Sequence, residues 1–484
     1  MSHLDWHDLP LEIWLVDILP RLHSEQLSRL GSTCKSLLSI TRPLLYCTVT
    51  LSAERYGQPN VALESVLSLL ERDRHLASFV EALTLDARAS AVERYSQNYN
   101  LIHPPSFRNM TRLKRLTIRG DISRSAGRKD VHTFLQLIQE RNLDQLAFPT
   151  PEIRSFLLPL HHSDDQPEKL SNSKRLVFSL TFDYHNHLGP VIQRILGAAQ
   201  PILTSISLHA PESILNLFFD LRFPHLQALE LAVLTRLNPT TPAGFYQFLV
   251  HHAAQLEELS LIPVGFARGR QYTGISFEPS NGSQSKLAQD FLPRLRVLKA
   301  AFRTVEALAR ARIDSFQRLE KLVIAAPNDD EAATAADIRH MFDSFHGPLP
   351  ALVDIGFHSQ LLAWLSIEER LAFVPEIIES VSRIAGFTLE KWSGVVYFPN
   401  TDQFTSKAFS RLRCIVFPPV DLQVNALSIT DFSSVFWTCE TLEEIRIRNK
   451  HPNSMDEVWT VNRRARELIC VGSEEASGSA NIAW

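Results

Sequence analysis

The chain has few cysteines, and none of them are paired at the spacing of a metal site. Its five cysteines are spread over 484 residues and include no C-x-x-C pair. Neither a disulfide framework nor a zinc site is therefore indicated, and a reducing compartment, cytoplasmic or nuclear, is the expected location. A secretory signal is not expected, because the first residues carry acids and no basic segment before an apolar core.

The sequence also lacks an excess of charge of one sign. Its 49 Lys and Arg residues nearly balance its 53 Asp and Glu residues, so the formal net charge is −4. This balance gives no electrostatic reason to expect a nucleic acid partner. No apolar run approaches the ~20 residues that a membrane-spanning helix needs, so we expect no membrane partner.

Specific catalytic signatures are missing as well. The sequence has no G-x-S-x-G, G-x-x-x-x-G-K-[ST], H-E-x-x-H or G-x-G-x-x-G motif. The adjacent pairs His161-His162 and His251-His252 are poor metal sites, because neighbouring side chains on a helix or strand diverge. His185 and His187 could share one face of a strand, but no third ligand lies near in sequence. We therefore expect no enzymatic activity, no cofactor and no metal.

What the sequence does contain is a repeated phrase, apolar-x-x-apolar-x-apolar, with a mean step of about 30 residues. The last two apolar positions alternate with a polar one, which predicts a short strand with one buried face. The phrases begin at Val80, Leu113, Leu143, Val177, Leu203, Leu226, Leu256, Leu295, Leu319, Leu352, Ile384, Leu412 and Leu442.

Segments with helical periodicity lie between the phrases. They cover residues 130–141, 211–221, 242–253, 335–345, 367–384 and 429–437. A repeated strand–turn–helix–turn unit buries its apolar face only against its neighbours. We therefore expect an α/β solenoid over residues 51–455, with short parallel strands inside and helices outside. A long loop is expected at 264–286, and a capping helix over 456–468 with a tail should form a last segment, 456–484.

The array resembles an irregular set of leucine-rich repeats. It departs from that family where an Asn or Cys is expected three residues after the last apolar position. Leu234 and Val264 stand at two of these places. The side-chain ladder that bonds the backbone of regular repeats is therefore expected to be largely missing, which leaves the curvature of the solenoid open.

The N-terminal segment, residues 1–50, has a different pattern, with apolar residues at helical spacing between prolines. Pro10 suits the first turn of a helix, and Pro20 should end that helix. Ser24 and Ser32 are candidate N-caps for two further helices, and Pro43 should close the third. Such a short segment cannot bury all its apolar groups alone, so the rest of the chain or a partner must cover them.

This segment resembles an F-box in the order and spacing of its motifs. It has an LPxEI start (Leu9-Pro10, Glu12-Ile13), an Ile18-Leu19 pair, a Cys34-Lys35 pair and a P-x-L-Y exit (Pro43 to Tyr46). The resemblance implies docking on the Skp adaptor and cullin of an SCF-type ubiquitin ligase. The adaptor contacts that it implies are Leu9, Pro10, Ile13, Ile18, Leu19 and Leu22. The other reading is a helical cap packed on the larger domain.

The residues between the buried positions of each strand should face away from the helices and form a surface for a target protein. The candidates are Arg115, Asp183, His209, Glu230, Glu258, Lys299, Asp354 and His358. Their charges are of both signs, so a groove for phosphate or nucleic acid is not indicated. Together with the F-box resemblance, this surface predicts the substrate-recognition subunit of an SCF-type cullin–RING E3 ubiquitin ligase. The alternative is a non-catalytic leucine-rich-repeat scaffold acting outside a ubiquitin ligase.

Overall fold

The computed structural model divides into two compact units, Met1–Thr204 and Ser205–Trp484. The described residues are 14, 19, 24–52, 61–87, 104–120, 133–149 without 135, 139 and 142, 173–179, 185–233, 241–261, 291–311, 314–325, 334–358, 367–394, 404–417 without 406, 439–447, 456–462 and 467–474.

Five parallel strands form the sheet of the first unit. Pairing joins β1 (Thr48–Ser52), β2 (Ala82–Ala87), β3 (Arg115–Gly120), β4 (Gln145–Phe148) and β5 (Arg175–Ser179) in that order. The register aligns the apolar positions of successive phrases, so that Leu116 pairs with Leu146 and Leu146 with Leu176. All three side chains are buried.

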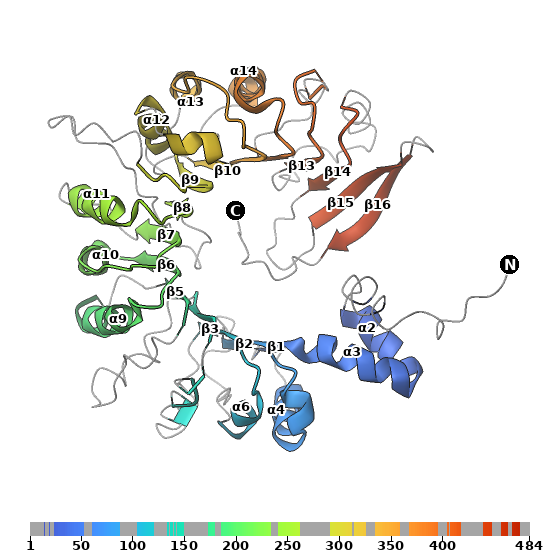
Figure 1. Cartoon of the computed structure of the whole chain (residues 1–484). Coiled ribbons are helices and arrows are strands. Elements are labelled where there is room, and N and C mark those ends of the chain that lie inside the picture. Colours follow the sequence, from blue (N-terminus) through green and yellow to red (C-terminus); the bar gives the residue numbers. More distant parts are fainter. Residues whose placement is uncertain are drawn as a thin grey trace. The chain divides into compact units, whose positions relative to one another are not determined.

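The helices that follow β1 in this unit lie on one side of the strands, whereas the first two precede β1 (Figure 1). In chain order, the helices are α2 (Ser24–Thr33), α3 (Lys35–Cys47), α4 (Val61–Arg72), α5 (Arg74–Ala77), α6 (Pro104–Asn109) and α9 (His185–Ala199). Hydrogen bonds join α6 to α4 of the preceding repeat: Ser106 Oγ donates to the Leu67 carbonyl at 2.7 Å, and Asn109 Nδ2 donates to the Glu71 carbonyl at 2.8 Å.

The second unit continues the same pattern with parallel strands and ends in an antiparallel hairpin. The parallel strands are β6 (Ser205–Ala210), β7 (Ala228–Val233), β8 (Glu258–Ser260), β9 (Val297–Ala301), β10 (Lys321–Ala325), β11 (Asp354–Phe357), β12 (Lys391–Ser393), β13 (Cys414–Phe417) and β14 (Glu444–Ile447). Strands β15 (Asp456–Asn462) and β16 (Glu467–Glu474) follow in antiparallel pairing.

Its helices again lie on one side of the strands (Figure 1). They are α10 (Glu212–Phe219), α11 (Thr241–His252), α12 (Phe302–Arg310), the 3-10 helix η7 (Asp314–Arg318), α13 (Ala335–Asp343) and α14 (Ile367–Ala385). Between α10 and α11 the aromatic rings of Phe218 and Phe248 pack with centroids 4.7 Å apart. Each unit is thus built as an α/β solenoid, as the repeated phrase predicts.

A main-chain ladder joins successive repeats at the start of their strands. At most of the parallel strands, the carbonyl of the residue before the strand accepts two N–H groups from the next repeat. The Glu81 carbonyl accepts from Lys114 at 2.9 Å and from Arg115 at 3.0 Å. In the second unit the Val353 carbonyl accepts from Glu390 and Lys391, both at 2.9 Å. This bonding lies at the start of the strands, whereas the expected Asn or Cys positions, such as Leu234, come after the strands have ended.

The predicted helix over 456–468 is wrong, because β15 and β16 form a hairpin there. Val458, Thr460 and Val461 are β-branched, and such side chains favour strands over helices. Strand β15 also satisfies the free backbone groups along the edge of β14, with which its residues 457–460 pair. Tertiary pairing therefore overrides the apolar spacing that suggested a helix.

Two predictions in the N-terminal segment are also wrong: the N-cap at Ser32 and the helix end at Pro43. Ser32 lies inside α2, where its Oγ donates to the Arg29 carbonyl at 2.6 Å. The N-cap of α3 is Cys34, whose Sγ accepts the Leu37 N–H at 3.5 Å. Pro43 does not close this helix, which continues to Cys47. A proline removes one helical hydrogen bond but leaves the residues after it free to stay helical.

Two of the thirteen phrases are out of register with the strands. In β5 the buried residues are Leu176 and Phe178, whereas Val177 faces the other way and is partly exposed. In the repeat that contains β12 the buried residues are Leu389 and Trp392, and Phe387 is 81% exposed. The phrases predicted from Val177 and Ile384 are therefore wrong by four and by five residues, because the observed phrases begin at Ser173 and Leu389.

The remaining predictions concern segments between the strands. His185 and His187 lie in α9, so the prediction that they share a strand face is wrong. The predicted loop at 264–286 and the helix at 429–437 lie outside the described residues. Residues 242–253 and 367–384 are helical nearly as predicted, since α11 and α14 cover them.

Gly394 provides a test of the corrected register in β12. Its φ is +75°, and a Cβ built on it would lie 2.1 Å from the Phe357 carbonyl oxygen. We expect Gly394→Ala to lower the free energy of unfolding by about 1–3 kcal/mol, because it adds strain and a clash. Gly347→Ala is the matched control, since nothing lies within 4 Å of its added Cβ. Equal urea denaturation midpoints for the two variants would contradict the register.

Candidate protein-binding surface

The face of the strands that points away from the helices carries most of the predicted target-binding residues. In the second unit these are His209 on β6, Glu230 on β7, Glu258 on β8, Lys299 on β9, Asp354 on β11 and His358 directly after β11. In the first unit Arg115 begins β3 and is exposed. Asp183 lies outside the described residues, and the phrase that placed it on a strand is wrong.

A hydrogen-bonded group joins β6 and β7 on this face. His209 Nε2 lies 2.9 Å from Glu230 Oε1 and 3.4 Å from Ser207 Oγ. Burial alone would raise the pKa of Glu230, but the hydrogen bond from His209 and the nearby charge of Lys299 outweigh burial and lower it. Glu230 is therefore ionised and already engaged within the face.

Lys299 is the central cation of the surface. Its pKa is lowered, chiefly because burial removes water from the ammonium group and also because Lys321 lies nearby. Glu230, Glu258 and Asp354 act in the opposite direction but do not cancel the effect of burial. Among the described residues, no acid lies within ion-pair distance of its Nζ, unlike Lys321, whose Nζ lies 2.9 Å from Asp354 Oδ2.

Two polar atoms on the same face are buried without a hydrogen-bond partner among the described residues. They are Ser260 Oγ on β8 and Asp354 Oδ1 on β11. Buried polar groups are normally paired, so unpaired ones mark positions where a partner can add a hydrogen bond. Both lie beside Lys299 or Lys321 in the strand register.

The sequence reasoning missed a second set of charged residues, at the rim where the strands begin. Lys114 Nζ lies 3.4 Å from Glu81 and Lys174 Nζ lies 3.3 Å from Asp144. Each of these residues directly precedes a strand, and their charges alternate from repeat to repeat. That alternation is visible in the sequence once the strand register is known. The pairs are exposed, so each contributes at most about 1 kcal/mol.

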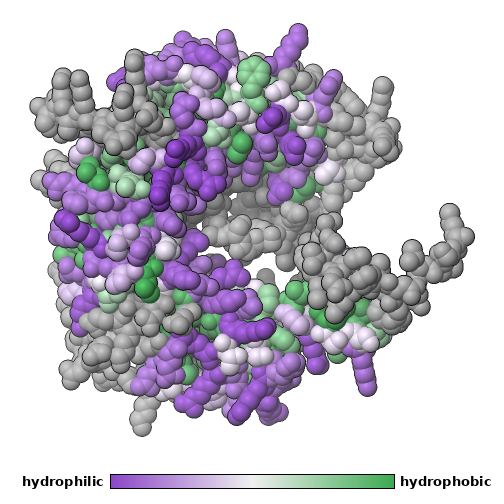
Figure 2. Space-filling model, in the orientation of Figure 1, coloured by the Kyte–Doolittle hydropathy of each residue, from purple (hydrophilic) through white to green (hydrophobic). Residues whose placement is uncertain are grey.

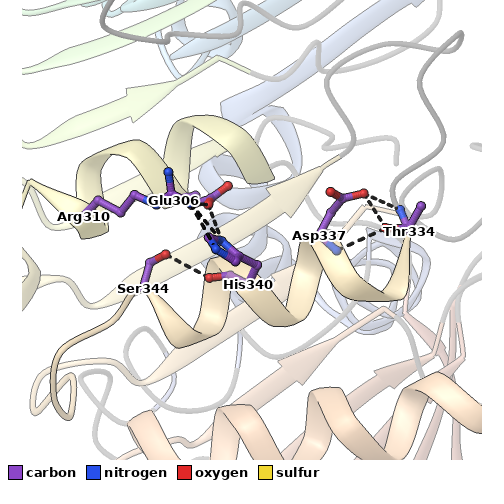
Figure 3. A network of polar contacts seen from close by, with 6 residues as sticks. All are labelled: Glu306, Arg310, Thr334, Asp337, His340 and Ser344. Carbon is purple, nitrogen blue, oxygen red and sulfur yellow. Dashed lines mark hydrogen bonds and ion pairs between the residues drawn. The ribbon is translucent and has the colours of Figure 1, made fainter. Parts of the chain in front are cut away.

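A polar network on α12 and α13 stabilises the helical side of the second unit (Figure 3). His340 Nδ1 lies 2.6 Å from Glu306 Oε1, and Arg310 also pairs with Glu306. At the start of α13, Thr334 and Asp337 form a capping box, which lowers the pKa of Asp337. The Glu306–His340 contact joins α12 to α13, and the capping box closes the start of α13, so both lie on the helices and not on the strand face.

The described surface is mostly hydrophilic, with hydrophobic residues scattered over the face seen in Figure 2. The large hydrophobic residues that are exposed among the described ones are Leu69, Ile202, Val250, Val353 and Phe387. The strand face therefore offers a partner charged and hydrogen-bonding groups more than an apolar surface.

Most of the predicted adaptor contacts cannot be placed on the structure. Leu9, Pro10, Ile13, Ile18 and Leu22 lie outside the described residues. Leu19 is described, and its side chain is fully buried by this chain, so here it is a core residue. Leu27 and Leu37 are buried as well, whereas Leu38 and Leu44 on α3 are partly exposed.

Among the described residues, no group of three or more His, Cys, Asp or Glu side chains is arranged to hold a metal ion. No described helix has the length and apolar character needed to cross a lipid bilayer. His251 and His252 have separate partners, since His251 Nε2 lies 3.3 Å from Arg222 and His252 Nε2 accepts the Phe223 N–H at 2.9 Å.

Comparison with known proteins gives distant structural similarity only. No protein-family model matches the chain, and no curated protein matches it. A chain in the crystal structure of the Rad7 and Elc1 complex in yeast is similar over 79% of this chain and 87% of that chain, with 13% identity and a TM-score of 0.36. A chain of the TLR13–ssRNA13 complex is similar over 79% of this chain and 57% of that chain, with 12% identity and a TM-score of 0.27. The repeat architecture is defined here by the strand pairing of the chain itself.

His252 makes the stability of the second unit depend on pH. Burial lowers its pKa from 6.5, and the Phe223 N–H occupies its Nε2, so the neutral ring carries its proton on Nδ1 toward the Phe248 carbonyl. Protonation to the charged ring is easier in the unfolded chain, where the pKa is not lowered. The stability that His252 contributes is therefore present above pH 6.5 and is lost as the pH falls below it.

We expect the melting temperature to fall between pH 7.5 and pH 5.5 and the fall to be smaller in His252→Gln, which does not titrate. His251→Gln is the control, because His251 is exposed. The same pH dependence in His252→Gln as in the unaltered protein would rule out this assignment. Thermal denaturation followed by circular dichroism measures the melting temperature of each protein at both pH values.

Proposed function

We propose that this chain is the substrate-recognition subunit of an SCF-type cullin–RING ubiquitin ligase. In this role the N-terminal segment docks on the Skp adaptor, and the strand face of the solenoid holds a target protein. The chain itself makes and breaks no bond. It raises the local concentration of target lysines near the charged ubiquitin-conjugating enzyme.

One observation carries the proposal: the motifs of the F-box resemblance coincide with the local structure around them. The Cys34-Lys35 pair marks the start of α3, and Cys34 caps it. The P-x-L-Y exit lies in the last turns of the same helix, which runs into β1 without a loop. A P-x-L-Y exit into a first strand is the order that the resemblance implies.

The packing of α2 and α3 also supports an external partner. Leu27 and Leu37 are buried, as expected for residues that close the contact between two helices. Leu30 on α2 and Leu38 and Leu44 on α3 remain partly exposed. Partly exposed apolar side chains on two adjacent helices provide an apolar surface that a partner can bury.

A second candidate is a scaffold that acts outside a ubiquitin ligase, with the helices serving as a cap. The full burial of Leu19 by this chain favours it. In that case the solenoid would still bind a protein, but the Skp adaptor would not associate with the chain.

Co-precipitation with purified Skp adaptor distinguishes the two candidates. We expect Leu9→Asp together with Ile13→Asp to reduce adaptor recovery by more than tenfold, because two charges would enter an apolar interface at about 1.4 kcal/mol per factor of ten. Leu69→Asp is the matched control, since Leu69 is exposed on α4 and lies outside the motif.

Adaptor binding that persists in the double variant, or that is absent from the unaltered chain, would contradict the ligase role. Circular dichroism spectra of the three proteins should coincide, so that lost binding is not mistaken for unfolding.

A further inference from the structure

The strand face of the second unit has an acidic patch directly beside a basic one. Glu230 on β7 and Glu258 on β8 form the acidic side. Lys299 on β9 and Lys321 on β10 form the basic side. The register places Glu258 opposite Val297 and Ser260 opposite Lys299, so the change of sign occurs between two adjacent strands.

Two of these four charges are already engaged, and two are not. Glu230 bonds to His209 at 2.9 Å, and Lys321 pairs with Asp354 at 2.9 Å. Glu258 is exposed, and neither it nor Lys299 has a side-chain hydrogen bond or ion pair with any described residue. The uncommitted acid and the uncommitted base therefore lie on neighbouring strands.

Ser260 adds an independent indication that this position takes a ligand. Its side chain is only 7% exposed, and its Oγ has no hydrogen-bond partner among the described residues. It is the register partner of Lys299 and lies two residues after Glu258 on the same strand. A hydroxyl beside an ammonium group can donate to the same carboxylate as that group does.

We propose that Glu258, Ser260 and Lys299 bind an extended segment of a partner protein that carries one basic and one acidic side chain. Glu258 pairs with the base, and Lys299 with Ser260 holds the carboxylate. Adjacent strands lie about 4.8 Å apart and residues rise about 3.3 Å each, so the Cα atoms of Glu258 and Lys299 are about 8 Å apart. The two ligand residues are accordingly two or three positions apart in an extended segment.

The surrounding charges favour such a segment over a partner of single sign. Glu230, Glu258 and Asp354 all act on Lys299, so a phosphate with two negative charges would be repelled by three carboxylates. A purely basic segment would instead meet Lys299 and Lys321. A base and an acid together match the order of charges on β8 and β9.

The reading of this segment as part of a ligase target rests on the proposed function, whereas the binding of the segment itself does not. The probe is a phage-displayed library of random 12-residue peptides, selected on the full chain. We expect selected peptides to share a base and an acid two or three residues apart. Lys299→Gln should weaken the best peptide about tenfold and remove the preference for the acid, while Glu258→Gln should remove the preference for the base.

Lys407→Gln and Glu379→Gln are the matched controls, because both residues are exposed and lie away from this face in sequence. A charge exchange adds a positive test: Lys299→Glu should bind better to the peptide whose acid is replaced by Lys. Ser260→Ala should weaken the original peptide without altering the preference for the base.

Selected peptides without the charge pair, or a preference that is the same in Lys299→Gln as in Lys407→Gln, would overturn the inference. Adaptor co-precipitation is measured on the same proteins. Adaptor binding with no charge preference leaves the ligase role standing and removes this inference. A charge preference without adaptor binding removes the ligase role and retains the peptide site.

Discussion

The main-chain ladder at the start of the strands is the interaction on which the rest of this fold depends. In both units a carbonyl directly before a strand accepts two N–H groups from the next repeat, as the Glu81 and Val353 carbonyls do. This bonding uses only backbone atoms, so it places no demand on the side chains at the rim. It therefore joins successive repeats whatever side chains stand at the rim.

A fold held by apolar phrases and backbone bonds leaves the outward strand positions open to variation. Those positions carry Glu230, Glu258 and Lys299 in the second unit, at sites that the core does not need. Charge at such positions costs little stability while it remains partly solvated, and it can distinguish one partner from another. Along the same short strands, one set of alternate residues is buried in the core and the other set carries the charges.

Much of the fold could be predicted from the apolar phrase, and the errors have clear physical causes. In the repeat of β5 the first apolar position is taken by the buried Ser173, and in that of β12 the last is taken by Gly394, so a purely apolar search shifted both. The hairpin over β15 and β16 was missed because pairing with β14 decides it. The candidate site residues on β6 to β11 were predicted from the sequence. Which of their charges are paired could not be predicted, because pairing depends on the strand register and on distances between side chains.

The direction of β15 sets a limit on how this solenoid can change in evolution. Each parallel repeat presents its successor with a strand edge and a helix surface of the same orientation, so whole repeats can be duplicated or deleted between existing ones. The antiparallel β15 reverses that orientation after β14. A further strand–helix crossover would meet an edge of the wrong polarity there. Gain or loss of repeats in this unit is thereby confined to the stretch before the hairpin.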